Sequence, residues 1–270
     1  MQALRQIDGW PVEFAAAGVV DPDGRVSTHG DVSRAVRLAS VSKPVAALAT
    51  LVAAEEGVVD LDEPAGPPGS TVRHLLAHTS GLPFEGAEPI ARPGHRRIYS
   101  NEAFRVLAAH VAERSEMHFA EYVREAVCAA LEIGLDPRGD PGSGMHASLA
   151  DVLAIGRELL APRLVADETR DEMVAVQFEG LSGVLPDHGR FDPLDWGLGV
   201  QLNTQPPSWM GTRTSPRTYG HFGGTGTFLW VDPDARVVCA ALTTREFDEW
   251  AKEAWPRFAD AVLDELQAPV

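Results

Sequence analysis

The sequence predicts a mixed α/β fold of the α+β type, with strands near both ends of the chain and helices between them. Two turn motifs support this prediction. Asp21-Pro22-Asp23-Gly24 separates strand-like segments at 12–20 and 25–28, and Asp232-Pro233-Asp234-Ala235 separates a similar pair at 227–231 and 236–243. Aspartate, proline and glycine between two apolar runs favour a hairpin. The middle of the chain, from residue 40 to about 180, has mostly helical patterns.

The first predicted helix is apolar on almost every side over residues 44–54. Such a helix is normally buried, and this one is too short to span a membrane. Pro44 fits only the first turn of a helix, so the helix should begin close to Ser40. Gly57 fits the position just after its end.

Two further helices have clear signals. Ser148 and Asp151 have the spacing of a capping box before a helix over 152–160. Residues 249–267 form an amphipathic pattern, and Pro256 lies inside it, where it marks either a kink or the start of the helix. The predicted apolar face comprises Trp250, Ala254, Phe258, Ala261 and Val262.

Ser40 and Lys43 form an S-x-x-K motif one helical turn apart, so both side chains lie on one face of the helix. The chain has only two lysines, Lys43 and Lys252. A buried lysine can lose its proton, whereas arginine cannot. The spacing therefore predicts a serine nucleophile activated by an amine. An ordinary N-cap serine followed by a first-turn lysine is also compatible with this pattern.

Two later motifs complete a constellation: Tyr99-Ser100-Asn101 and His221-Phe222-Gly223-Gly224-Thr225-Gly226. The order S-x-x-K, Y-S-N, H-x-G resembles the serine β-lactamase and penicillin-binding-protein superfamily, in the branch of class C β-lactamases, D-Ala-D-Ala carboxypeptidases and related esterases. The segment at 75–83 resembles the H-T-S-G-L signature of that family. Trp196-Gly197-Leu198-Gly199 resembles the strand before its third motif.

The resemblance implies a β-lactamase/transpeptidase-like fold. Strands from both ends of the chain would join in one antiparallel sheet flanked by helices, with an inserted helical lobe. We expect a single domain over residues 1–270, with the sheet lobe at roughly 1–60 and 190–270 and the helical lobe at roughly 61–189. The active site would lie between the two lobes.

The same resemblance implies catalytic roles. Ser40 would be the acylated nucleophile, and Lys43 and Tyr99 would share the general-base and general-acid work. The backbone N–H groups of Ser40 and Gly224 would form the oxyanion hole. Tyr99 is also compatible with a purely structural role as a buried aromatic residue.

Substrate-binding roles would belong to Asn101, His221, Phe222 and Gly223. Asn101 would hydrogen-bond the substrate and help to place the lysine, although it could instead cap the helix at 102–113. His221 stands where relatives have Lys or His, and outside this motif it would more often be a core histidine. Its place in the motif favours a role in the site.

The third motif departs from the K-T-G and H-T-G patterns, because Phe222 has no hydroxyl and His221 is largely neutral at pH 7 unless perturbed. A substrate carboxylate would therefore be held poorly. We expect a serine hydrolase for small esters or uncharged amides. The alternatives are a β-lactamase, a D-amino-acid peptidase or a catalytically silent binding protein. Trp209, Met210 and Gln205-Pro206-Pro207 could line the cleft, or could form an exposed irregular loop.

Composition limits the partners. The chain has 23 Lys and Arg against 39 Asp and Glu, a net charge of −16, so nucleic acid and anionic membranes would repel it. The expected partner is a small ester, amide or lactam, and no metal or cofactor motif is present. Cys128 and Cys239 lie in apolar segments typical of buried free thiols. The N-terminal residues have no apolar leader pattern, which predicts a cytoplasmic protein. The sequence does not indicate an oligomeric state.

Overall fold

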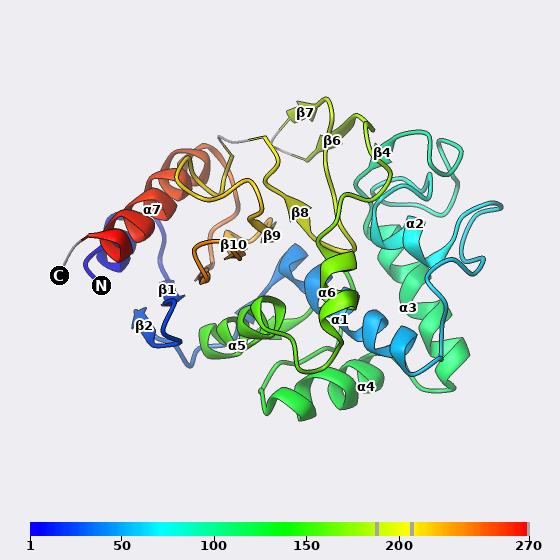
Figure 1. Cartoon of the computed structure of the whole chain (residues 1–270), viewed down its shortest axis with the longest axis horizontal. Coiled ribbons are helices and arrows are strands. Elements are labelled where there is room, and N and C mark those ends of the chain that lie inside the picture. Colours follow the sequence, from blue (N-terminus) through cyan, green and yellow to red (C-terminus); the bar gives the residue numbers. More distant parts are fainter. Residues whose placement is uncertain (187–188, 206–207, 269–270) are drawn as a thin grey trace.

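Six antiparallel strands from the two ends of the chain form the main sheet (Figure 1). The computed structural model describes residues 1–186, 189–205 and 208–268. The strand order is β2-β1-β11-β10-β9-β8. These strands are β1 (Ala15–Val20), β2 (Val26–His29), β8 (Gln201–Leu202), β9 (Tyr219–Gly223), β10 (Thr227–Asp232) and β11 (Val237–Thr243). Ala15 lies opposite Thr243, and Val20 lies opposite Val238. This pairing confirms the predicted sheet of N- and C-terminal strands.

Both predicted hairpins are present, since β1 pairs with β2 and β10 pairs with β11. Alternate side chains of these strands enter different cores, as the period of two requires. In β10, Leu229 and Val231 join the core beneath helix α5 (Leu149–Leu160), whereas Phe228 and Trp230 join the core beneath helix α7 (Glu249–Gln267). Figure 1 shows these two helices on opposite sides of the sheet.

Helix α7 has the predicted bounds, but the predicted apolar face is displaced by about one position. The buried stripe comprises Ala251, Trp255, Phe258, Ala259, Val262 and Leu263, whereas Trp250, Ala254 and Ala261 are only half-buried. The stripe centres on Trp255 because its ring packs against Phe228 and Phe247. Pro256 does not start the helix. Asp248 caps it, accepting a hydrogen bond from the Trp250 backbone N–H.

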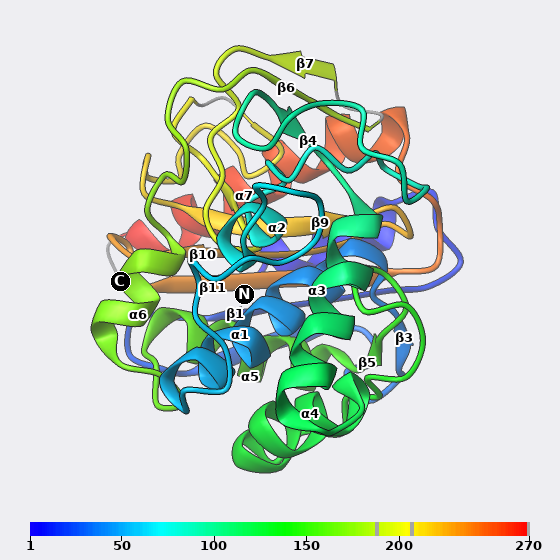
Figure 2. The ribbon, with the colours of Figure 1, turned by 90° about the vertical axis from the view of Figure 1, so that its right-hand side faces the viewer.

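Helix α1 (Ser42–Glu55) is the centre of the helical part, and each of its residues from Ser42 to Ala53 is buried, as predicted. Gly57, just beyond its end, has the left-handed φ of 72° expected there. Figure 2 shows α3 and α4 in front of α1. The other helices of this part are α2 (Val72–Leu76), α3 (Asn101–Ser115), α4 (Phe119–Val123), the π-helical turn η3 (Arg124–Ala129), α5 and α6 (Asp167–Met173).

Short elements complete the fold. Ser148 and Asp151 form the predicted capping box at the start of α5. Two small sheets join the helical part to its surroundings, one of order β3-β5 and one of order β4-β6-β7. Their strands are β3 (Val36–Arg37), β4 (Arg97–Ile98), β5 (His146–Ala147), β6 (Gly183–Leu185) and β7 (Gly189–Phe191), and a 3₁₀ helix, η1 (Ala3–Gly9), packs against α7.

Two local predictions were wrong, and a third concerns residues that the structure does not describe. Trp196-Gly197-Leu198-Gly199 forms no strand apart from an isolated bridge at Trp196, because the chain turns there before β8 begins at Gln201. Trp209 and Met210 do not line a cleft, since both are buried in the core beneath α7. Pro206 and Pro207 lie outside the described residues.

The structure confirms that Cys128 and Cys239 are free and buried. Within the described ranges, no helix is both long and apolar enough to cross a membrane.

Replacing Phe258 by alanine should lower the free energy of unfolding by about 3–5 kcal/mol, because a fully buried ring would leave a cavity between α7 and the sheet. This ring lies 5.4 Å from Trp10 and 6.1 Å from Phe228, between centroids. Urea denaturation followed by circular dichroism measures the loss. The matched control is Arg257→Ala, at an exposed position next to it that forms a surface ion pair with Glu253, where we expect a loss of ~1 kcal/mol or less. Equal losses in both variants would contradict the packing argument.

Candidate active site

Ser40 lies in a single 3₁₀ turn, η2 (Ala39–Val41), between β3 and α1. Helix α1 begins at Ser42, two residues after the serine, so Ser40 belongs to the entry turn rather than to the helix. Ala39 has a φ of 46°, in the left-handed region that a residue with a Cβ avoids. Such backbone strain persists only where the surroundings hold it.

The surroundings that hold this turn come from β9 and β10. Thr227 Oγ1 donates a hydrogen bond of 2.7 Å to the Leu38 carbonyl, directly before the turn. Gly223 approaches the same carbonyl so closely that a Cβ would lie 2.3 Å from the oxygen. Glycine is therefore required at position 223 by packing. The end of β9 and the serine turn are fixed against each other.

Lys43 is completely buried, and its Nζ lies within hydrogen-bond distance of three oxygens. These are Ser40 Oγ at 3.3 Å, Asn101 Oδ1 at 2.6 Å and the Gly142 carbonyl at 3.0 Å. Burial lowers the pKa of the Lys43 amine to about 7, although nearby carboxylates oppose the shift. A substantial fraction of the lysine is therefore neutral at pH 7.

The arrangement gives the neutral amine a direction. A neutral amine has two N–H groups and one lone pair. An amide oxygen and a peptide carbonyl can only accept hydrogen bonds. Asn101 Oδ1 and the Gly142 carbonyl therefore take the two N–H groups, and the lone pair is left facing Ser40 Oγ. This is the geometry in which an amine can remove a hydroxyl proton.

Tyr99 directs its phenol toward the same place. Its hydroxyl lies 3.5 Å from His221 Nε2, and its ring packs edge-on against Trp196. Burial raises the pKa of the phenol above its usual range, and the nearby Ser40 hydroxyl opposes this shift only in part. Tyr99 therefore stays protonated at neutral pH, so it is suited to donate a proton rather than to act as a phenolate base.

His221 lies on β9, where its ring is almost completely buried. Its Nδ1 is 2.7 Å from the Phe222 carbonyl, which can only accept, so Nδ1 carries the proton and Nε2 faces Tyr99 as an acceptor. Burial, together with a smaller effect of the nearby Lys43 amine, lowers the pKa of the ring to about 3. His221 is therefore an uncharged member of the site.

Asn101 lies at the start of α3 but does not cap it. The N-cap is Ser100, whose Oγ accepts a 2.9 Å hydrogen bond from the Ala103 N–H. The capping interpretation of Asn101 was therefore wrong, because the preceding serine already occupies that position. Freed from capping, the amide of Asn101 contacts Lys43 through Oδ1 and Glu85 through Nδ2.

His78, in the segment that resembles the H-T-S-G-L signature, has a structural position behind Tyr99. It follows the C-cap residue of α2 with a left-handed φ of 57°, and so ends that helix. Its Nδ1 accepts a hydrogen bond from the Ser100 N–H, and its ring lies 4.6 Å from that of Tyr99. The histidine thus supports the tyrosine.

A small apolar cavity of about 100 Å³ opens at Ser40. None of the described residues that line it is Asp, Glu, Lys or Arg. They are Ser40, Phe84, Tyr99, Leu185, Pro186, His221, Phe222, Gly224 and Phe247. Gly224 has no protein atom within 4 Å of where a Cβ would be, so packing does not explain this glycine. The cavity brings together the predicted Ser40, Tyr99, His221, Phe222 and Gly224, while Lys43 and Asn101 lie behind the serine and Gly223 packs beneath it.

Several residues of the site were not predicted. Phe84 stacks on Tyr99 at 6.0 Å, and Phe247 packs 4.8 Å from Phe222. Phe84 follows directly on the recognisable segment at 75–83, so its position was a usable signal. Phe247 and Leu185 had no signal, because they belong to loops and strands far away in the sequence. Gly142 was missed for the same reason.

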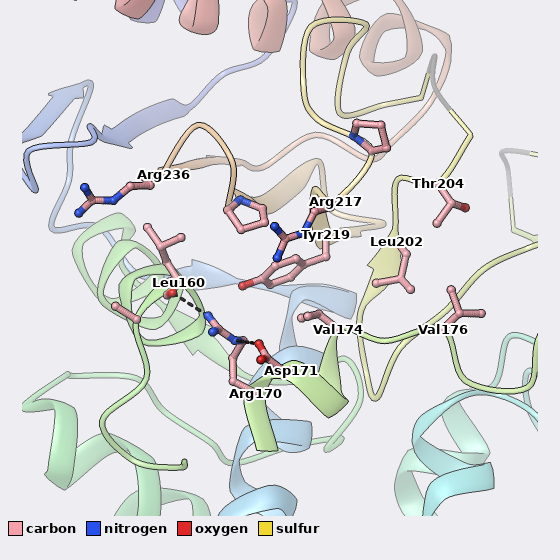
Figure 3. Close-up of a pocket in the computed structure, with 13 residues that line it drawn as sticks. Leu160, Arg170, Asp171, Val174, Val176, Leu202, Thr204, Arg217, Tyr219 and Arg236 are labelled. Atoms are coloured by element: carbon pink, nitrogen blue, oxygen red, sulfur yellow. Dashed lines mark hydrogen bonds and ion pairs between the residues drawn. The ribbon is translucent and has the colours of Figure 1, made fainter. Parts of the chain in front are cut away.

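A larger cavity of about 440 Å³ lies away from Ser40, between α6 and the far end of β9 (Figure 3). Arg170 and Arg217 are among the residues that line it. Arg170 makes a hydrogen bond to the Leu160 carbonyl and an ion pair with Asp171. This cavity contains none of the predicted site residues, so cavity size does not indicate the site here.

The antiparallel sheet, the pairing of Ser40 with the buried Lys43 and the facing tyrosine define the class of the molecule, which is the β-lactamase/transpeptidase fold. The chain belongs to the Beta-lactamase family, whose model matches residues 1–263.

Relatives agree with this assignment. A β-lactamase from Mycobacterium bovis has a structure similar to 98% of this chain and 100% of its own, with a TM-score of 0.95 and 49% identity. Penicillin-binding protein 4* of Bacillus subtilis is 28% identical over an alignment of 200 residues that covers 57% of this chain and 43% of that protein. This chain therefore matches less than half the length of that relative.

A more distant structure shares the fold alone. EstCE1, described as a hydrolase with promiscuous acyltransferase activity, has a TM-score of 0.79 and 19% identity, over 97% of this chain and 96% of its own.

The ring of His221 should remain a neutral imidazole with its proton on Nδ1 from about pH 8 to about pH 5, because its pKa is lowered to about 3. Two-dimensional ¹⁵N NMR of histidine-labelled protein distinguishes the tautomers. His221→Gln identifies the signal by its disappearance. A titration midpoint near the ordinary value of about 6.5 would show that the ring is more hydrated than the structure indicates.

Proposed function

We propose that the protein is a serine hydrolase that acts on small uncharged esters or amides through an acyl-Ser40 intermediate. One observation carries the proposal. The Ser40 hydroxyl lies 3.3 Å from the amine of a fully buried lysine whose pKa is lowered to about 7, at an uncharged apolar cavity. The nucleophile therefore lies next to both its base and a cavity that could hold the substrate.

In the acylation step, the Lys43 lone pair takes the Ser40 proton while Oγ forms a bond to the acyl carbon. The carbonyl oxygen becomes an oxyanion, for which the backbone N–H groups of Ser40 and Gly224 are the proposed donors. As the tetrahedral intermediate collapses, the bond to the leaving group breaks. The Tyr99 phenol gives that group its proton and regains one from the Lys43 ammonium.

In the deacylation step, water attacks the acyl-Ser40 carbonyl. The water proton passes to the same neutral base, and the proton returns to Ser40 Oγ as the acid product leaves. The sequence resemblance gave Lys43 and Tyr99 the general-base and general-acid roles jointly, and the directions of their pKa shifts favour one role for each. Lys43 is the group that can be neutral near pH 7, and Tyr99 is the group that keeps its proton.

The preference for uncharged substrates follows from the lining of the cavity. A carboxylate in the cavity would lose hydration without gaining a cation, because the described lining residues include no Lys or Arg and the pKa of His221 is lowered to about 3. Phe84, Phe222 and Phe247 offer apolar surface instead. A short acyl chain or a small aromatic group suits this surface.

β-Lactam hydrolysis is the second candidate function. It is supported by the family and by the description of the 49%-identical relative from Mycobacterium bovis as a β-lactamase. The same Ser–Lys–Tyr chemistry would open a lactam ring. The absence of a cation among the described lining residues argues against tight binding of the carboxylate that β-lactam antibiotics carry.

Exposure to a fluorophosphonate should add one adduct to the protein, measured by intact-mass spectrometry, and Ser40→Ala should add none. Lys43→Ala should label at least about 100-fold more slowly, because it lacks the general base. The matched control is Lys252→Ala, which removes the other lysine, a half-buried residue of α7 that pairs with Glu249, and should label at the wild-type rate. An adduct that persists in Ser40→Ala, or a Lys43→Ala variant that labels normally, would overturn these assignments.

A matched pair of aryl esters tests the charge preference. We expect kcat/KM for p-nitrophenyl butyrate to exceed that for p-nitrophenyl hemisuccinate by about tenfold or more, because the second ester has a carboxylate in place of the terminal methyl group. It should also exceed kcat/KM for a cephalosporin. A cephalosporin turned over faster than both esters would favour the β-lactamase function.

A further inference from the structure

The two acceptors that orient Lys43 are each held by a carboxylate. Glu85 Oε1 accepts a 3.0 Å hydrogen bond from Asn101 Nδ2. Asp140 Oδ1 accepts a 3.0 Å hydrogen bond from the Gly142 N–H. The two carboxylates come from segments 55 residues apart in the sequence, so their meeting at one amine results from the fold.

Arg105 joins the two carboxylates. From the second turn of α3, its Nη1 donates to Glu85 Oε2 at 2.5 Å, and its Nε donates to Asp140 Oδ2 at 2.6 Å. The hydrogen bonds thus close into a ring. Followed in order, the ring is Lys43, Asn101, Glu85, Arg105, Asp140, Gly142 and back to Lys43.

We propose that Glu85, Arg105 and Asp140 are positioning residues that close this ring and thereby fix the lone pair of Lys43 on the Ser40 hydroxyl. The inference rests on the proposed function, in which Lys43 is the base. It extends that function to residues that touch neither the substrate nor the nucleophile.

Glu85 sets the orientation of the Asn101 amide. An ionised carboxylate has acceptors only, so it requires the NH₂ end of the amide to face it. The oxygen end must then face Lys43, where it takes one N–H. With the amide reversed, its NH₂ group would compete for the lone pair that the serine needs.

Asp140 sets the position of the second acceptor. Its Oδ1 also accepts a 3.0 Å hydrogen bond from Ser143 Oγ, and its carbonyl accepts one of 2.7 Å from the Gly144 N–H. The chain is thus wound tightly over residues 140–144. A Cβ on Gly142 would lie 3.0 Å from Phe104 Cβ and 3.4 Å from Lys43 Nζ, so the glycine lets this turn approach the amine.

Arg105 suits its place because a guanidinium presents donors in a fixed fork, and a lysine there could not reach both carboxylates in the same way. Glu102, one turn earlier on α3, accepts a further 3.0 Å hydrogen bond from Arg105 Nη1. The Arg105 and Glu85 side chains are 38% and 51% exposed. Surface ion pairs of this kind contribute little to stability. A stabilising role alone therefore explains the ring poorly.

The ring also acts on the Lys43 amine through charge. Burial dominates and lowers the pKa of the amine, the Asp140 and Glu85 carboxylates raise it, and Arg105 lowers it. The neighbouring titratable groups are the His221, His78 and Tyr99 side chains, and burial favours the neutral form of each. Removing a carboxylate from the ring should therefore lower the pKa of Lys43, and removing the arginine should raise it.

The test uses Glu85→Gln, Asp140→Asn and Arg105→Met. Because the chain has only two lysines, ¹³Cε-lysine labelling gives one signal for Lys43 and one for Lys252, and Lys43→Ala assigns them. We expect the Lys43 titration midpoint to move to lower pH in the two carboxylate variants and to higher pH in Arg105→Met. The acid limb of kcat/KM for p-nitrophenyl butyrate should move with it.

The variant Arg105→Lys tests the geometry of the ring, because it keeps the positive charge but loses the guanidinium donors that reach both Glu85 and Asp140. Its kcat should fall about tenfold or more, as expected of a displaced base, while the acid limb stays near that of the wild type. Arg114→Met is the matched control. Arg114 lies near the end of the same helix and pairs with Glu63, and its removal should leave both readouts unchanged.

Thermal unfolding of each variant separates loss of fold from loss of position. Glu85→Gln is the conservative variant, since the half-exposed side chain keeps its size. Titration midpoints of Lys43 that are equal in all folded variants, or that move in one common direction, would overturn the inference. If the wild-type protein hydrolyses no ester, but the Lys43 titration midpoints of the variants move as expected, the proposed function is overturned and the inference about the ring still holds.

Discussion

Lys43, in the first turn of α1, places a primary amine where protein encloses it completely. An amine in such a place is held only if each polar hydrogen finds an acceptor, since an unmatched buried donor costs about 1–3 kcal/mol. The polar partners of the amine come from three parts of the chain: the serine turn, the start of α3 and the turn at Gly142. The sheet, the helices and the loop must all be in place before the amine is satisfied. The site is therefore complete only when these parts of the chain have come together.

Burial favours the uncharged forms of the titratable groups at the site. It lowers the pKa values of Lys43 and His221 and raises that of Tyr99. For Lys43 the folded-state pKa of about 7 lies below the ordinary lysine value of 10.5, so the unfolded chain binds more protons between those values. The contribution of Lys43 to the free energy of unfolding therefore rises with pH across that window. A neutral Lys43 can accept a proton, and the neutral forms of Lys43 and His221 do not attract anions.

Short-range features of the molecule were predictable from the sequence, whereas contacts between distant segments were not. The S-x-x-K spacing, the two hairpin turns and the Ser148–Asp151 capping box depend on neighbours within a few residues, and the structure has all of them. The Ser100 cap was missed because a serine and an asparagine stand together and either suits that position. The Glu85–Arg105–Asp140 ring had no sequence signal. Charged side chains at those spacings are typical of any solvated surface, and only the fold brings them to one amine.

Tight packing around α1 explains how the site holds its distances without metal or disulfide in the described residues. Alanines dominate this helix, and small side chains let neighbouring backbone approach closely. A Cβ on Gly199 would lie 2.4 Å from the Ala47 Cβ. On the far side of Tyr99, the buried Arg97 guanidinium hydrogen-bonds the carbonyls of Ala77, Gln177 and Leu194, and so joins three loops. Interiors packed in this way resist deformation. The distance between Ser40 and Lys43 is therefore set by the packed elements around them.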